Sequence, residues 1–157
     1  NDVMVKHKKI SSCFCEILPS LREEFCYLLI GVNLNINMTP EQTTLVPSST
    51  SMLVEAGKEF DKEMVLKTVS CCLKNSIHDF LERGVRPKFF NDIDRYLAFK
   101  GQRIEVELGP NSIVEGKLIG LDKDGSFLLE MCRGEIWKIK GGRILRLLTD
   151  ESEAYSH

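Results

Sequence analysis

The hydrophobic period of this chain changes at Gly101. In the long stretch that precedes it, from Asp61 to Leu97, apolar residues recur every three or four positions; after it, they alternate in short runs separated by turn residues. Short alternating runs joined by tight turns predict strands and favour a small barrel. The predicted strands are 103–108, 113–122, 126–131, 135–139 and 143–148. We therefore expect an all-β domain over 101–148, with a domain boundary near 98–101.

The first residues, NDVMVKHKKISSCFCEIL, predict a hairpin of strands 2–5 and 9–18 joined by a basic turn. A third strand is expected over 24–33, where apolar residues are nearly continuous. Such a strand is typical of a sheet that is buried on both faces, so we expect both faces to be covered.

Helices are expected after these strands, beyond a loop over 38–51 that contains two prolines and many hydroxyls. They are a short helix around 50–56 ending at Gly57, a long one from the N-cap Asp61 to Gly84, and one opening at Pro87 with Phe90, Ile93 and Leu97 on one face. In the long helix, the apolar spacing runs through Val65, Val69, Cys72, Leu73, Ile77, Phe80 and Leu81. The whole is an α+β fold: a mixed α/β part over 1–98, the barrel over 101–148 and an acidic tail over 149–157.

Composition excludes several classes of protein. The 157 residues suffice for one domain or two small ones, and a hydrophobic content of 43% supports a core. A net charge of −2 argues against a nucleic-acid partner, which would favour a basic surface. The longest apolar stretch, 27–32, is too short to span a membrane.

Cysteine usage indicates a reducing compartment. Six cysteines occur without a CxxC pair, and their spacing does not suit a zinc site, so we expect no metal. Free, buried thiols are the simplest interpretation, and they favour the cytoplasm.

Three blocks in order resemble the biotin–protein ligases, and the resemblance covers nearly the whole chain. They are ND…KKISSCFCE near the start, IGVNLNIN over 30–37, and GKLIGLDKDGSFLLE over 116–130. The resemblance implies that 1–98 is the C-terminal part of a ligase catalytic domain and that 101–148 is its SH3-like barrel. It also implies that the first half of the catalytic domain, with its Arg/Gly-rich loop over the biotinyl adenylate, is missing.

The family's activity is expected to follow from this resemblance. Biotin is adenylated with ATP and Mg²⁺ as co-substrate, and the biotinyl group is then transferred to a lysine of a biotin carrier protein domain. Lys9 matches the family's catalytic lysine, and Asp2 matches the aspartate beside it. From the residues alone, Lys6, Lys8 and Lys9 would form an ordinary solvated turn, and Asp2 would lie at a frayed end.

The resemblance further implies substrate or nucleotide contacts at Asn1, Ser12, Gly31, Asn33 and Asn35. Ser12 and Asn33 replace family glycines, which are used where backbone approaches a ligand closely. Asn33 would place an amide on the pocket wall, so biotin binding is in doubt. For Asn35, capping of its own backbone is an equal alternative.

Three functions stay open at this point. The chain is part of a biotin–protein ligase, inactive without its other half; or a ligase-like scaffold that has lost catalysis; or a partner-binding protein that uses the barrel. An exposed Trp137 would favour the last, although Trp in a small barrel is more often core. The sequence also leaves open whether the chain forms a dimer.

Overall fold

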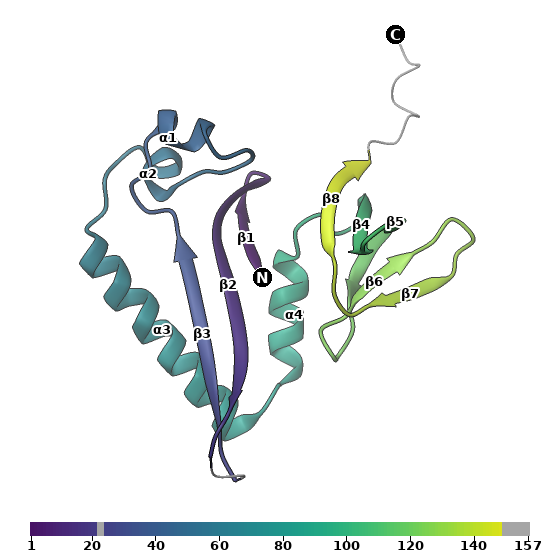
Figure 1. Ribbon diagram of the computed structural model, residues 1–157, viewed down its shortest axis with the longest axis horizontal. Helices are drawn as coiled ribbons and strands as arrows, with labels where there is room; N and C mark the ends of the chain where they lie inside the picture. The colour runs from purple at the N-terminus through teal and green to yellow at the C-terminus, as the bar shows by residue number, and fades with distance from the viewer. Residues whose placement is uncertain (22–23, 149–157) are drawn as a thin grey trace. The chain divides into compact units, whose positions relative to one another are not determined.

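The computed structural model describes residues 1–21 and 24–148, so the acidic tail expected over 149–157 lies outside the described residues. The chain divides into two compact units, Asn1–Glu82 and Arg83–His157, whose elements are labelled in Figure 1. This division by contacts falls earlier than the domain boundary expected near 98–101, which stays a prediction.

The first unit is built on an antiparallel sheet with strand order β1-β2-β3. Its strands are β1 (Asp2–Val5), β2 (Lys8–Pro19) and β3 (Cys26–Leu34), as the sequence predicts. Lys6 and His7 form the β1–β2 turn with positive φ values of 48° and 63°, the conformation of a tight two-residue hairpin turn. The described residues contain one isolated parallel bridge, Lys9 to Ser49, and no parallel strand pair.

Strand β3 is apolar but not buried on both faces. Its large side chains Tyr27, Leu28, Leu29 and Val32 are all exposed. The expectation that both faces are covered is wrong for the described part of the chain, because the elements present do not bury these side chains.

Two short helices follow the sheet. The first, α1 (Pro40–Thr44), lies within the stretch expected to be a loop. Thr39 caps it in a capping box with Gln42, and Pro40 suits its first turn. The second, α2 (Met52–Ala56), ends as predicted at Gly57, which has a left-handed φ of 68°.

The long helix α3 (Lys62–Arg83) begins and ends as predicted. The Asp61 carboxylate accepts the backbone N–H groups of Glu63 and Met64, and Gly84 follows the helix with a φ of 65°. The half-buried apolar side chains recur at every fourth position, at Val65, Val69, Leu73 and Ile77. This stripe is narrower than expected, because Cys72, Phe80 and Leu81 are exposed. In Figure 1 the helix runs alongside β3.

The described part of the second unit, 83–148, contains one helix and the five predicted strands. They are α4 (Pro87–Tyr96), β4 (Arg103–Gly109), β5 (Ser112–Leu121), β6 (Phe127–Glu130), β7 (Ile136–Ile139) and β8 (Arg143–Leu148). The sheet is antiparallel with order β7-β6-β5-β4-β8. Among the described residues β7 and β8 do not pair with each other, so the strands form an open sheet and no closed barrel.

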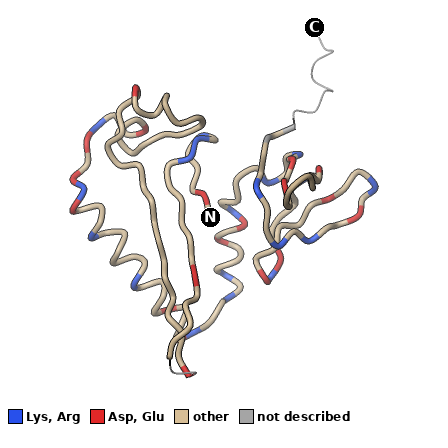
Figure 2. The backbone as a smooth tube through the Cα atoms, in the orientation of Figure 1, with Lys and Arg blue, Asp and Glu red and all other residues tan. Residues whose placement is uncertain are grey.

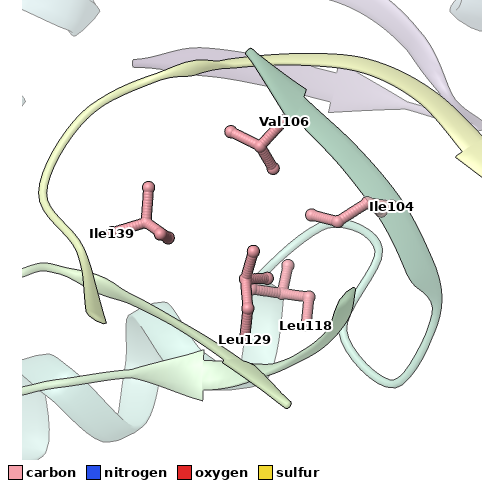
Figure 3. Packing of buried hydrophobic residues seen from close by; sticks show 5 residues of the cluster. All are labelled: Ile104, Val106, Leu118, Leu129 and Ile139. Carbon is pink, nitrogen blue, oxygen red and sulfur yellow. The ribbon is translucent and has the colours of Figure 1, made fainter. Parts of the chain in front are cut away.

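The core of the second unit is small and fully apolar. Its buried side chains, which converge in Figure 3, are Ile104, Val106, Leu118, Leu129 and Ile139. Trp137 is not part of this core. It is exposed on β7, at an edge of the described sheet, contrary to the expectation that a Trp here is buried.

All six cysteines have free thiols, but the expectation that they are buried is wrong. Five are exposed and Cys13 is partly buried. None of the described helices combines the length and apolar character that crossing a membrane requires.

Candidate functional site

Lys9 and Asp2 form an ion pair at the start of the sheet. The Lys9 Nζ lies 2.9 Å from Asp2 Oδ1, and their side chains are 45% and 46% exposed. The regular pairing of β1 with β2 is interrupted between Val3 and Met4, just after Asp2 in the sequence. The structure thus brings together the two residues predicted to be catalytic. A pair this exposed contributes only about 0–1 kcal/mol to stability.

Two further site residues, Ser12 and Asn33, lie in one row with Asp2 across the sheet. Asp2 pairs with Ser12, and Ser12 pairs with Asn33. Directly opposed residues of antiparallel strands point to the same face. Asp2, Ser12 and Asn33 therefore share one face, and Asn33 is exposed on it.

The backbone of Lys9 is fixed by a segment that the sequence analysis assigned to a loop. The Lys9 N–H donates to the Ser48 carbonyl at 2.7 Å, and the Thr50 N–H donates to the Lys9 carbonyl at 2.9 Å. Thr50 and Ser51 are fully buried, and Ser51 caps α2 while its hydroxyl donates to the Met38 carbonyl. The hydroxyl run after Pro47 was the available signal for this anchoring role.

Glu55 connects α2 to the basic turn before Lys9. Its carboxylate accepts the Thr50 hydroxyl at 2.7 Å and lies 3.1 Å from Lys6 Nζ. The hydrogen bond from Thr50, and then the one from Lys6, lower the pKa of Glu55. Figure 2 shows the turn between β1 and β2 as mostly basic. Sequence reasoning missed Glu55, because its charged partner Lys6 lies far from it in the sequence.

Gly31 lies opposite Phe14, and the Phe14 ring covers it. A β-carbon on Gly31 would lie 1.8 Å from the ring atom Cε1. The space that the family resemblance assigns to a ligand is therefore occupied by an aromatic side chain in this chain.

The two remaining predicted site asparagines, Asn1 and Asn35, form hydrogen bonds with the backbone of neighbouring segments. The Asn35 side chain donates to the Thr50 carbonyl at 3.0 Å, so it binds a neighbouring segment and not its own backbone. The Asn1 carbonyl accepts the Cys13 N–H at 2.8 Å. Asn37, which sequence reasoning did not select, exchanges two hydrogen bonds with the backbone of Phe60.

Other candidate sites are weak in the described part of the chain. It contains no group of three or more His, Cys, Asp or Glu side chains that could hold a metal ion. An open hollow of about 500 Å³ along α3 includes none of the predicted site residues; its lining is Ser70, Leu73, Lys74, Ile77, His78 and Leu81.

Comparison with known proteins decides the family. Residues 99–147 match the family model described as the biotin protein ligase C terminal domain. The fold of the first unit matches part of the catalytic domain of solved biotin protein ligases. Residues 99–147 belong to the biotin protein ligase C terminal domain family.

Two curated members of the biotin protein ligase family align with most of the chain. The bifunctional ligase/repressor BirA of Bacillus subtilis (strain 168) is 25% identical over 137 residues, which are 85% of this chain and 41% of BirA. The BirA of Bacillus spizizenii is 23% identical over 137 residues, which again are 85% of this chain and 41% of BirA. The chain therefore spans about two fifths of the length of these relatives.

Solved members of the biotin protein ligase family share the fold. The apo ligase of Aquifex aeolicus matches 96% of this chain and 63% of its own, with a TM-score of 0.75 and 24% identity. The same ligase in complex with biotin and ATP has a TM-score of 0.73, again at 24% identity, over 96% of this chain and 60% of its own.

Proposed function

We propose that this chain supplies the lysine-bearing part of the active site of a biotin protein ligase. The enzyme would adenylate biotin with ATP and transfer the biotinyl group to a lysine of a biotin carrier protein domain. The observation that supports this most is the Lys9–Asp2 ion pair, because these are the two residues that the family resemblance selects as catalytic.

Lys9 would act in the first step. The biotin carboxylate attacks the α-phosphorus of ATP, a P–O bond forms, and the bond to pyrophosphate breaks. Negative charge builds on the phosphate oxygens, where a fixed cation lowers the barrier. Lys9 suits this role, because two hydrogen bonds with Ser48 and Thr50 fix its backbone and its ammonium group remains half-exposed.

Asp2 would orient the Lys9 ammonium group and assist the second step. There the carrier lysine, as a neutral amine, attacks the carbonyl carbon of the anhydride, an amide forms, and AMP leaves. An aspartate near the incoming amine can accept its proton. Mg²⁺ is commonly held by substrate phosphates and one or two carboxylates, and Asp2 offers one such carboxylate.

The other predicted contact residues differ in how well their positions suit a substrate contact. Ser12 and Asn33 share the face of Asp2, so both are suited to line the substrate site. Asn1 and Asn35 are more suited to hold the local backbone, given their hydrogen bonds. Gly31 would contact substrate only if the Phe14 ring moved away from it.

The second unit would be the SH3-like C-terminal domain of the ligase. We base this finer assignment on the family model over 99–147 and on five short antiparallel strands around one core.

Residues 1–157 alone would not make biotinyl-adenylate at an appreciable rate. The anhydride survives only where water is excluded, and the Arg/Gly-rich loop expected to close over it is not in this sequence. The test is pyrophosphate release on adding biotin, ATP and Mg²⁺ to the isolated chain. Release near background is the expected result, and sustained turnover would refute this part of the proposal.

A partner-binding role for the second unit is the alternative candidate. The exposed Trp137 on β7 favours it, because exposed aromatic side chains are enriched at interfaces. A ligase-like scaffold without catalysis would keep this surface. Absence of biotinyl-adenylate formation, even when the chain is completed by the other part of a catalytic domain, would favour the scaffold.

A further inference from the structure

The backbone segment beside Lys9 continues the sheet at the point where β3 ends. The last residue pair of β2 with β3 joins Ser11 to Leu34, and Lys9 lies beyond this pair. There Lys9 forms an isolated parallel bridge with Ser49. The net contribution of a backbone hydrogen bond to stability is modest. The segment therefore needs further contacts to stay against Lys9.

Thr50 provides these contacts through its N–H, its carbonyl and its hydroxyl. The N–H donates to the Lys9 carbonyl at 2.9 Å, the carbonyl accepts the Asn35 side-chain amide at 3.0 Å, and the hydroxyl donates to the Glu55 carboxylate at 2.7 Å. Thr50 is fully buried. A buried polar group that loses its partner is not compensated by water, so these hydrogen bonds favour one position of Thr50.

Glu55 is itself held in place, so it is a fixed acceptor for the Thr50 hydroxyl. It lies on α2, its side chain is only 18% exposed, and its carboxylate also lies 3.1 Å from Lys6 Nζ. The first residue of α2, Met52, donates its N–H to the Asn35 carbonyl at 2.9 Å. Helix α2 is therefore attached to the end of β3.

We propose that Thr50 and Glu55 are positioning residues for Lys9. The bond from the Thr50 hydroxyl to Glu55 holds the Thr50 backbone, and the Thr50 N–H holds the Lys9 carbonyl. This inference rests on the proposed ligase function and extends it to residues that act on the reaction only through Lys9. Misplacing a catalytic group by about 1 Å can cost about a hundredfold in rate, so loss of this anchor should appear in kcat.

Thr50→Val tests the link, because valine has nearly the shape of threonine and lacks its hydroxyl. In the chain completed by the other part of a catalytic domain, kcat for pyrophosphate release should fall about ten- to a hundredfold, with little change in KM for biotin and ATP. Thr50→Ser keeps the hydroxyl and should retain the rate. Thr68→Val is the matched control, because the Thr68 hydroxyl is hydrogen-bonded within α3, to the Met64 carbonyl. This variant should leave the rate unchanged.

Glu55 offers a second pair of variants for the same link. Glu55→Ala removes the acceptor of the Thr50 hydroxyl and should lower kcat as Thr50→Val does. Glu55→Gln keeps an oxygen that can accept this hydroxyl, so it should retain more of the rate than Glu55→Ala. This pair tests the proposal even if Thr50→Val fails to fold.

Amide hydrogen exchange of the chain alone gives a measurement that requires no substrate. In Thr50→Val and Glu55→Ala, the N–H groups of residue 50 and of Lys9 should exchange faster than in the wild type, because the segment is released from Lys9. Amide groups in the middle of β2 and β3 should exchange as in the wild type. This comparison separates local release from a loss of the fold.

Three results would overturn the inference: faster exchange at Lys9 without a fall in kcat, unchanged exchange at Lys9 in both variants, or equal losses of rate from Thr50→Ser and Thr50→Val. The ligase proposal fails separately. If the completed wild-type chain makes no biotinyl-adenylate, the proposed function is refuted, and exchange at Lys9 decides whether Thr50 positions this lysine.

Discussion

The Phe14 ring lies against the backbone of Gly31, so close that a β-carbon there would be 1.8 Å from the ring. Gly31→Ala must therefore displace the ring. We expect a loss of about 1 kcal/mol in the free energy of unfolding, at the low end of overpacking effects because Phe14 is exposed and can move. Urea denaturation of the first unit measures this change.

The sign should reverse when Phe14 is removed. Gly31 does not have a positive φ, so in the Phe14→Ala background Gly31→Ala should stabilise the fold by about 0.4–1 kcal/mol through the unfolded state. An equal effect of Gly31→Ala in both backgrounds would contradict this contact.

The Glu55 carboxylate should make stability depend on pH. Its pKa is lowered in the fold by the hydrogen bonds from Thr50 and Lys6. A carboxyl with a lowered folded pKa stabilises the fold above its unfolded pKa, and this contribution is lost as the pH falls through the folded value. Glu55→Gln should therefore destabilise the fold at pH 7, and the difference from wild type should shrink as the pH falls below the ordinary Glu pKa of 4.5.

Urea denaturation across that pH range measures the effect of Glu55→Gln. Glu59→Gln, at an exposed carboxylate of the same unit, is the control and should change stability little at any pH. A Glu55→Gln effect that is constant with pH would show that the carboxylate charge does not contribute.

The core of the second unit should govern the stability of that unit. Leu118 is fully buried among the other core side chains, so Leu118→Ala should cost about 2–5 kcal/mol. Ile113→Ala, at a side chain of the same unit that is 57% exposed, should change stability by less than about 0.5 kcal/mol. Chemical denaturation followed by Trp137 fluorescence reports on the second unit, and an equal loss from both variants would contradict the assignment of the core.

Most of the secondary structure could be predicted from the sequence, because local signals determine it. Gly57, Asp61 and Pro87 each mark a helix end or start where the structure has one. The five strands after Gly101 follow from alternation and turn residues. Helix α1 was missed because its capping box at Thr39 was taken for loop composition.

Burial and contacts between segments were harder to predict. The apolar pattern of β3 indicates that the strand favours burial on both faces. In the described residues its large side chains are exposed, because a local pattern does not specify which element covers a strand. The pairing of Lys9 with Asp2 followed from a family resemblance, and the structure brings the two side chains together. Glu55 and the segment around Thr50 contact Lys6 and Lys9, which are distant in the sequence, and local patterns do not contain such contacts.

Asn33 should limit biotin binding if its side chain lines the pocket. In the chain completed by the other part of a catalytic domain, Asn33→Gly should tighten biotin binding, because it removes an amide from the face shared with Asp2 and Ser12. Isothermal titration with biotin compares the variant with wild type. Equal affinities would mean that the Asn33 side chain points away from bound biotin.

The most direct test of the account is pyrophosphate release from ATP and biotin by the completed chain, with Lys9→Ala compared with Lys8→Ala. Removing the charge that stabilises the developing phosphate should lower the rate about a hundred- to a thousandfold, or about 2.7–4 kcal/mol, mostly in kcat. Stability should fall by no more than about 1 kcal/mol, because the Lys9–Asp2 pair is half-exposed. Lys8→Ala should change the rate little. Equal losses from the two substitutions, or full activity of Lys9→Ala, would contradict the assignment of Lys9 as the catalytic lysine.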